Sequence, residues 1–184
     1  LGAQEDKIVI NGNSKYDHLT EKVDRDTSSK MKQFFNLKEN HKVIIAGSTR
    51  NGEDEIIIDT FKKLNKKFDD LILIVAPRHL NRDEDIKNIA IEKGFNTIYK
   101  TEIDEGQKRK EEQLIILNTI GDLFSVYSIG DIIFCGASLV PKGGQNIMEA
   151  AVWGKIVLYG PSMEDFEDAK DILEEVNAGV EVED

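Results

Sequence analysis

Short apolar runs alternate with longer amphipathic segments along most of this chain. The runs with a strand pattern are Lys42–Ala46, Leu71–Ala76, Asn96–Tyr99, Gln113–Leu117, Asp131–Cys135 and Lys155–Tyr159. The segments with a helix pattern are Glu53–Lys67, Arg82–Lys93, Leu123–Ser128, Asn146–Trp153 and Asp165–Val176. Several strands consist of consecutive Ile, Leu and Val residues, which is typical of a parallel sheet covered on both faces. The pattern therefore predicts an α/β fold with a doubly wound, mostly parallel sheet.

The remaining segments are more polar and less periodic. Ile8-Val9-Ile10 has a strand pattern and Asn11-Gly12-Asn13 a turn pattern. The polar stretch Glu21–Lys30 is expected to be a linker or a surface loop, after which the apolar residues of Phe34–Leu37 pack a short helix onto the domain. Lys100–Glu112 is rich in charged residues, and we expect it to be a solvated loop.

The length, net charge and cysteine content of the chain disfavour several classes of function. The 184 residues suffice for one domain with a core and a short extension. The net charge of -11 disfavours binding to nucleic acid or to anionic lipid. The single cysteine, Cys135, excludes a disulfide framework and is expected to be a reduced core residue of a cytosolic protein. Since the chain begins at Leu1 and stops within the strand-like run Gly179–Val182, we expect a fragment of a longer protein.

In doubly wound sheets, ligands bind beyond the carboxyl ends of the strands. Here those ends carry small, polar and basic residues. They are Gly47-Ser48-Thr49-Arg50, Pro77-Arg78-His79, Asn118-Thr119-Ile120-Gly121, Gly136-Ala137-Ser138 and Gly160-Pro161-Ser162. This edge of an acidic domain is therefore predicted to be rich in hydrogen-bond donors.

The segment Gly136–Glu149 is the most informative part of this edge, because it has the pattern strand, glycine loop, helix. Gly143 and Gly144 allow the backbone to approach a ligand closely, and a helix beginning at Asn146 would offer unpaired N–H groups to a phosphate. Glu149 lies one turn into that helix, where it could accept hydrogen bonds from sugar hydroxyls. The alternative is a plain tight turn at the glycine pair. Neither a Walker loop nor a GxGxxG fingerprint occurs, which disfavours ATPases and classical dehydrogenases.

Three other strand ends allow two interpretations each. Arg78-His79 could hold a phosphate or form a surface pair before a helix. Ser48-Thr49 could form a phosphate loop or cap the helix that follows. In the turn 118–123, the backbone could read a base edge, or Asp122 could simply cap a helix.

Metal and nucleophile chemistry are not favoured. The Asp-x-Asp patterns at Asp24-Arg25-Asp26 and Asp83-Glu84-Asp85 resemble those of metal-dependent glycosyltransferases, but the second lies in a predicted first helical turn, where acids are common. The three histidines lack the spacing of zinc ligands, and no nucleophilic serine motif occurs. No residue stands out as a general base for sugar transfer.

Taken in order, these motifs resemble the C-terminal half of the 3-deoxy-D-manno-octulosonic acid (Kdo) transferases, the lipid A glycosyltransferases of Gram-negative envelopes. The segments that carry the resemblance are residues 11–17, Ala46-Gly47-Ser48-Thr49, residues 52–55, Pro77-Arg78-His79, residues 119–123, the run Gly136–Glu149 and residues 154–161. The most specific of them is the run from Ser138 to Asn146.

The resemblance implies a GT-B enzyme with two Rossmann-like lobes. Residues 41–184 would be the donor lobe, which binds CMP-Kdo, and residues 1–40 an inter-lobe strand and linker. A missing N-terminal lobe would hold the lipid A precursor lipid IVA, the membrane contact at the cytoplasmic face of the inner membrane and the catalytic base. Transfer would be inverting, without metal or cofactor, and the fragment alone would bind donor only.

The resemblance also implies site residues. The expected CMP-Kdo contacts are Arg78, His79, Ile120, Gly121, Asp122, Gly143, Gly144, Gln145, Asn146 and Glu149. Further contacts to the donor phosphate or sugar are expected from Ser48, Thr49, Ser138 and Lys142. The sequence departs from the family pattern at Arg50 and Gln145, where His is common, and at Ala150, where Pro is common. Two other hypotheses for the function stay open: a UDP-sugar transferase or epimerase of the same fold, and a stand-alone nucleotide-binding module.

Overall fold

The computed structural model describes Gln4, Lys7 and residues 16–183. The predicted strand at residues 8–10 and the predicted turn at residues 11–13 lie outside the described residues. The strands are β1 Lys42–Thr49, β2 Leu71–Pro77, β3 Thr97–Tyr99, β4 Leu114–Ile116, β5 Ile132–Cys135, β6 Ile156–Tyr159 and β7 Gly179–Glu181. Each predicted strand within the described residues is confirmed, with ends shifted by a few residues.

These strands form one seven-stranded sheet in the order β3-β4-β2-β1-β5-β6-β7. Every neighbouring pair is parallel, as the apolar runs predict. The chain moves outward from β1 through β2 toward β3 and β4, and then returns to the other side of β1 with β5. A crevice therefore opens between the loops that follow β1 and β5, which is where doubly wound sheets bind ligands.

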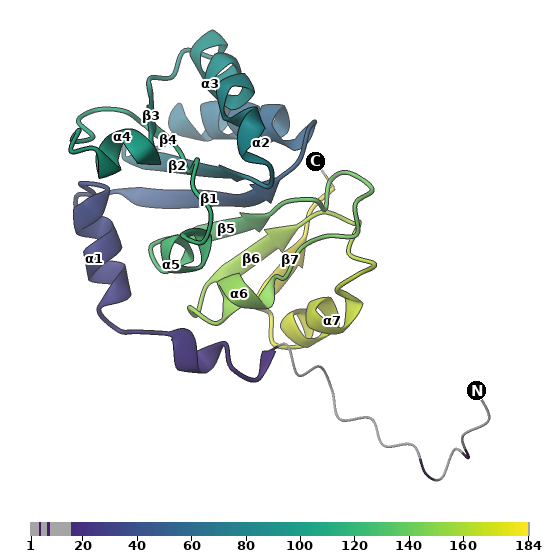
Figure 1. Cartoon of the computed structure of the whole chain (residues 1–184). Helices are drawn as coiled ribbons and strands as arrows, with labels where there is room; N and C mark the ends of the chain where they lie inside the picture. Colours follow the sequence, from purple (N-terminus) through teal and green to yellow (C-terminus); the bar gives the residue numbers. More distant parts are fainter. Residues whose placement is uncertain (1–3, 5–6, 8–15, 184) are drawn as a thin grey trace.

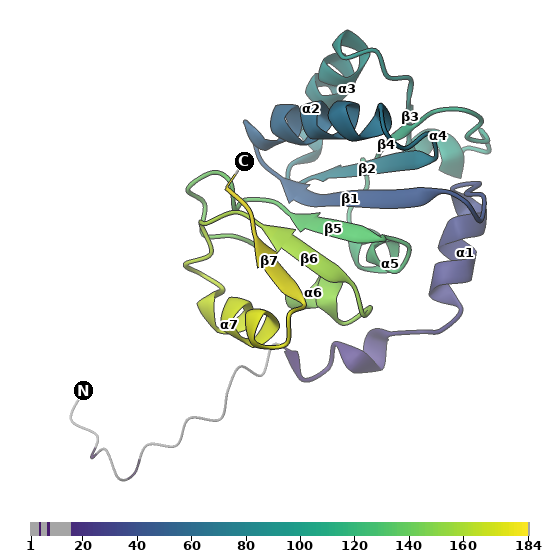
Figure 2. The ribbon, with the colours of Figure 1, turned by 180° about the vertical axis from the view of Figure 1, so that it is seen from behind.

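The helices divide between the two faces of the sheet (Figures 1 and 2). They are α1 Thr27–Phe34, α2 Glu53–Asn65, α3 Asp83–Glu92, α4 Lys100–Asp104, α5 Leu123–Tyr127, α6 Met148–Ala151 and α7 Glu167–Glu175, with 3-10 turns η3 Thr20–Lys22 and η4 Leu80–Arg82. The helices α2 and α3 pack on one face through residues such as Ile58, Phe61 and Ile86. The helices α1, α5, α6 and α7 contribute to the second core on the other face.

The prediction that both faces of the sheet are covered is only partly confirmed. The inner strand β2 is buried at every position. On the α2 face, however, no helix among the described residues lies over β5, β6 and β7 (Figure 2), and Ile132 and Ile156 remain 41% and 51% exposed. An apolar run can therefore mark a strand whose second face is open.

Two loop predictions are only partly right, because residues 27–30 and 100–104 are helical while the rest of each stretch lies in short turns and loops. The second part of Glu21–Lys30 begins α1, which ends at Phe34, and Phe35 behind it is fully buried. Lys100–Glu112 begins with α4 and contains Arg109, which is only 2% exposed. The Arg109 guanidinium donates to the main-chain carbonyls of Phe35, Asn36 and Glu112, each at 2.8 Å. Arg109 therefore links the end of α1 to the loop before β4 and is not a solvated surface residue.

Helix α6 is shorter than the predicted Asn146–Trp153. Gly143 and Gly144 have left-handed φ values of 77° and 81°, and regular helix begins only at Met148. Gly154, at φ 68°, ends the turns that follow. A four-residue helix contributes little macrodipole, so an anion site here depends on loop N–H groups more than on a helix start.

Candidate functional site

A cavity of about 250 Å³ lies at the carboxyl ends of the central strands. Its lining comes from the end of β1, from the loops after β2, β4 and β5, and from α5 and α6. The lining residues are Ser48, Arg78, Gly121, Leu123, Phe124, Tyr127, Gln145, Asn146 and Glu149. Six of the residues predicted from the sequence are thus brought together from four separate stretches of the chain: Ser48, Arg78, Gly121, Gln145, Asn146 and Glu149.

Glu149 and Asn146 form the polar wall that the sequence predicts. Asn146 Nδ2 donates to Glu149 Oε1 at 3.3 Å, and Asn146 Oδ1 accepts the N–H of Met148 at 3.2 Å. Asn146 therefore fixes the first turn of α6 and orients the carboxylate of Glu149. Glu149 is half-buried, and its Oε2 accepts no hydrogen bond from the described residues. It can accept hydrogen bonds from a hydroxylated ligand.

The glycine pair acts mainly through packing. Gly144 N donates to Ala137 O at 2.9 Å, and Gly143 N donates to Ser162 Oγ at 3.0 Å, so the protein itself uses both N–H groups. A Cβ atom at Gly143 would lie 2.4 Å from Asp165 Oδ2, and one at Gly144 would lie 2.5 Å from Met163 Sδ. Neither glycine lines the cavity. The residues that this turn delivers to the cavity are Gln145 and Asn146.

Tyr127 forms the floor of the cavity, and the sequence reasoning missed it. Its side chain is 3% exposed, and burial raises its pKa well above the ordinary value. A Cβ atom at Gly47 would lie 2.0 Å from Tyr127 Oη, so β1 can pass under this ring only with glycine at that position. Leu123 and Phe124 add an apolar wall that was also missed. The available signal was the helical spacing of apolar residues after Gly121.

The other predicted contacts near β1 and β2 do not line the cavity. Thr49 is fully buried, and its carbonyl accepts the N–H of Arg78 at 3.0 Å. Exposed His79 lies outside the lining, with its Nε2 2.7 Å from Arg50 Nη1.

The remaining predicted contacts lie beside or behind the cavity. Ile120 is 87% exposed. Asp122 Oδ2 accepts the hydroxyl of Thr119 at 2.5 Å and forms an ion pair with Lys100 at 3.1 Å. Ser138 is buried, donating to Cys135 O at 2.6 Å and accepting the N–H of Gly160 at 2.8 Å, whereas Lys142 is exposed. Ser138 therefore joins β5 to β6, and its hydroxyl is occupied within the protein.

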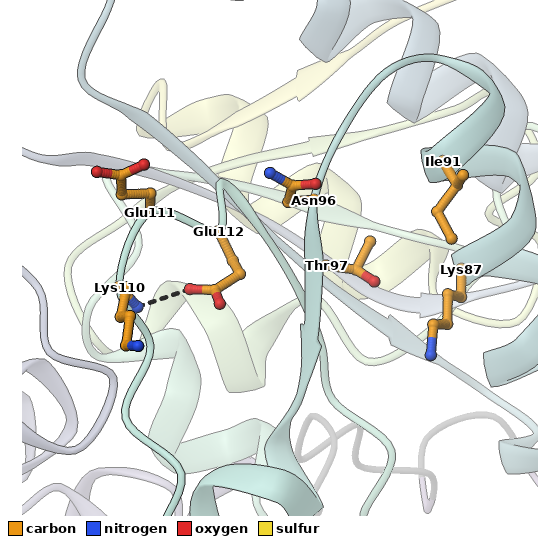
Figure 3. Close-up of a pocket in the computed structure, with 7 residues that line it drawn as sticks. All are labelled: Lys87, Ile91, Asn96, Thr97, Lys110, Glu111 and Glu112. Carbon is orange, nitrogen blue, oxygen red and sulfur yellow. Dashed lines mark hydrogen bonds between the residues drawn. The ribbon is translucent and has the colours of Figure 1, made fainter.

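A second, wider cavity lies at the opposite edge of the sheet. Figure 3 shows its lining, from Lys87 and Ile91 of α3 to the loop that precedes β4. Its volume is about 640 Å³, and the Lys110 N–H donates to Glu112 Oε2 within it at 2.6 Å. Because Thr97 begins β3 here, this cavity lies at the amino ends of the strands, away from the crevice of a doubly wound sheet.

Within residues 16–183 and the two isolated positions before them, no three His, Cys, Asp or Glu side chains converge as a metal site would require. Over those same positions, none of the helices has the length and apolar character needed to cross a bilayer.

The sequence is similar to curated glycosyltransferases. A bifunctional glycosyltransferase/methyltransferase of Fusobacterium nucleatum is 36% identical over 94% of this chain and 26% of its own length. The 3-deoxy-D-manno-octulosonic acid transferase of Haemophilus influenzae is 32% identical over 99% of this chain and 42% of its own length. The corresponding Aquifex aeolicus transferase is 35% identical over 76% of this chain and 37% of its own length. The chain thus spans less than half of these relatives, and no family model matches it.

Solved structures agree with this relationship. The crystal structure of the C-terminal CMP-Kdo binding domain of WaaA from Acinetobacter baumannii superposes with a TM-score of 0.78 at 26% identity, covering 86% of this chain and 81% of that domain. A glycosyltransferase from Rickettsia africae, with a TM-score of 0.62 and 20% identity over 98% of this chain and 44% of its own, shares the fold. This Rossmann-like domain of GT-B type is therefore similar over most of its length to the 3-deoxy-D-manno-octulosonic acid transferases, and its fold matches that of the C-terminal domain of WaaA.

Proposed function

We propose that this chain is the donor-binding domain of a glycosyltransferase that transfers Kdo from CMP-Kdo to a lipid A precursor in lipopolysaccharide biosynthesis. The observation that carries the proposal is the cavity at the carboxyl ends of the central strands, where Arg78, Asn146 and Glu149 line one volume. A cation, polar loop groups and a hydroxyl-binding carboxylate are the groups that a nucleoside monophosphate requires. The similarity to a domain described as binding CMP-Kdo supports the same ligand class.

Each part of the lining has a chemical role in this proposal. The Arg78 guanidinium binds the donor phosphate through parallel N–H bonds. Glu149 accepts hydrogen bonds from the ribose hydroxyls, and the wall of Leu123 and Phe124 provides an apolar surface for the base. When CMP leaves, its phosphate gains negative charge, which the fixed donors around Arg78 and Asn146 stabilise without reorganisation. These groups act without a metal or a cofactor.

The remaining steps belong to a second lobe. Inverting transfer needs a general base to take the proton of the acceptor hydroxyl. We assign this base, lipid IVA and the contact with the cytoplasmic face of the inner membrane to an N-terminal lobe joined through residues 1–40. The cavity of about 250 Å³ is smaller than the roughly 300–1,000 Å³ of complete ligand pockets, which fits a site formed by two lobes. The 41–184 domain alone then binds the donor and transfers nothing.

Calorimetric titration with CMP tests the ligand assignment. We expect Glu149→Ala to lose about 1–3 kcal/mol of binding free energy, because ribose hydroxyls are left without an acceptor in a partly buried site. Glu175→Ala removes the same charge from an exposed position at the end of α7 and should leave the affinity unchanged. UDP should displace CMP only weakly. Equal affinity of the Glu149→Ala variant, or tighter binding of UDP, would overturn the assignment.

A further inference from the structure

Glu53 is a buried carboxylate that the proposed donor chemistry does not use. It is the first residue of α2, its side chain is fully buried, and no Lys or Arg of the described chain forms an ion pair with it within 4.0 Å. Its oxygens accept four main-chain N–H groups instead. Oε2 accepts those of Arg50 and Ala137 at 2.7 and 2.8 Å, and Oε1 accepts those of Ser138 and Leu139 at 3.0 Å each.

The successive N–H groups after β5 form an anion-binding concavity of the kind that often holds phosphate. Here the anion belongs to the protein. Glu53 fills the position from inside the domain, so these N–H groups at residues 137–139 are not available to a ligand. The carboxylate therefore joins the loop after β1 to the loop after β5, at the crevice where the strand order reverses.

Both joined loops continue into the walls of the cavity. On one side, Arg50 lies two residues after Ser48, which lines the cavity and has an unusual left-handed φ of 57°. On the other side, Ala137 also has a left-handed φ, of 60°, and its carbonyl accepts the N–H of Gly144 at 2.9 Å. Gly144 directly precedes Gln145 and Asn146, which line the opposite wall.

The two loops also touch through their backbones. A Cβ atom at Gly136 would lie 2.7 Å from Thr49 Cα and 2.8 Å from Ser48 O. Left-handed conformations at residues other than glycine persist only where surrounding contacts impose them. The Glu53 carboxylate supplies such contacts to both loops at once.

We propose that Glu53 is a positioning residue of the donor site, which holds Ser48 on one wall and Gln145 and Asn146 on the other in binding geometry without touching the donor. This inference rests on the proposed function. It predicts that the affinity for CMP depends on a carboxylate at position 53, and that the carboxylate need not be attached to the chain.

The test compares CMP binding by Glu53→Ala with and without sodium formate, at a temperature where circular dichroism shows the variant folded. We expect at least a tenfold weaker Kd in Glu53→Ala and saturable recovery with formate, because formate can occupy the vacated N–H groups. Glu55→Ala, on the same helix at a side chain that is 66% exposed, is the matched control and should bind CMP normally. Glu149→Ala should bind weakly without recovery.

Three outcomes overturn the proposal: unchanged CMP affinity in folded Glu53→Ala, formate raising the melting temperature without restoring affinity, or equal recovery in Glu149→Ala. If Glu53→Ala does not fold, Glu53→Gln is tested instead, because its side-chain amide keeps the volume of the carboxylate but presents an N–H donor to two main-chain N–H groups. Unchanged CMP affinity in Glu53→Gln contradicts the positioning role of Glu53. If the parent chain does not bind CMP, the proposed function fails separately. The positioning claim is then tested by the amide resonances of Ser48 and Gln145, which must shift in Glu53→Ala and return with formate.

Discussion

At the scale of single residues, the site combines residues that could be predicted from the sequence with residues that only the fold places there. Asn146 and Glu149 follow from their place after a glycine loop, and both line the cavity. Tyr127 and Glu53 could not be found in this way, because their roles depend on β1 and β5 lying side by side. An aromatic residue on the apolar face of a helix, or an acid in its first turn, has the same sequence pattern whether or not it contributes to a ligand site.

The contact between Gly47 and Tyr127 gives a prediction. In Gly47→Ala, the new methyl group would lie 2.0 Å from Tyr127 Oη, so the Tyr127 ring or β1 must shift at the cavity wall. We expect a loss of about 1–3 kcal/mol in the free energy of unfolding and weaker CMP binding. Adding Tyr127→Phe removes the clashing oxygen and should recover part of both, as measured by urea unfolding and calorimetry. A single variant with normal CMP affinity would show that Tyr127 does not form the floor.

Cys135 gives a prediction for alkaline pH. Burial raises the pKa of its thiol from 9.0 to about 12, so the folded state keeps this proton while the unfolded chain loses it. The free energy of unfolding should therefore fall as pH rises above about 9, by roughly 1.4 kcal/mol per pH unit from this group. Urea unfolding at about pH 8 and about pH 10 should show a smaller decrease in Cys135→Ala than in the parent chain. Equal decreases would mean that this thiol does not contribute.

At the scale of elements, the strands and the amphipathic helices were predictable, and the helices α4 and α6 were not. The apolar runs of the strands and the periodic patterns of α2, α3 and α7 fix these elements within a few residues. The short helices α4 and α6 depend on tertiary contacts and on loop glycines. The buried hydrogen bonds of Arg109 could not be predicted from a run of charged residues, because the sequence does not indicate which of these side chains donates to main-chain carbonyls.

A buried ion pair joins α2 to the start of α3. The Arg82 guanidinium contacts the Asp54 carboxylate, whose side chain is 2% exposed, and also donates to Thr49 O at 3.1 Å. Arg82→Met should lower the free energy of unfolding by about 3–5 kcal/mol, because it leaves a buried carboxylate unpaired. The double variant Arg82→Met, Asp54→Leu should recover most of that loss in urea unfolding. A small effect of the single variant would mean that water reaches Asp54.

At the scale of the whole molecule, alternating strands and helices give the fold class, and the reversal of strand order at β1 gives the location of the site. The sequence pattern could not supply the strand order, in which β4 lies between β2 and β3. The predicted parallel direction did separate the two edges of the sheet, although each edge carries a cavity lined by polar residues. Only the parallel direction of all strands makes one edge the carboxyl edge, where the donor is proposed to bind.

The most direct test of the account is an amide-resonance map of the chain during titration with CMP. The account predicts saturable shifts around the cavity at the carboxyl edge, above all at Gly121, Gln145, Asn146 and Glu149. Lys87, Thr97 and Lys110, which line the cavity at the amino edge, should stay unshifted. Shifts concentrated at the amino edge, or no saturable shift at Asn146 and Glu149, would contradict the claim that a cytidine nucleotide binds where β1 and β5 separate.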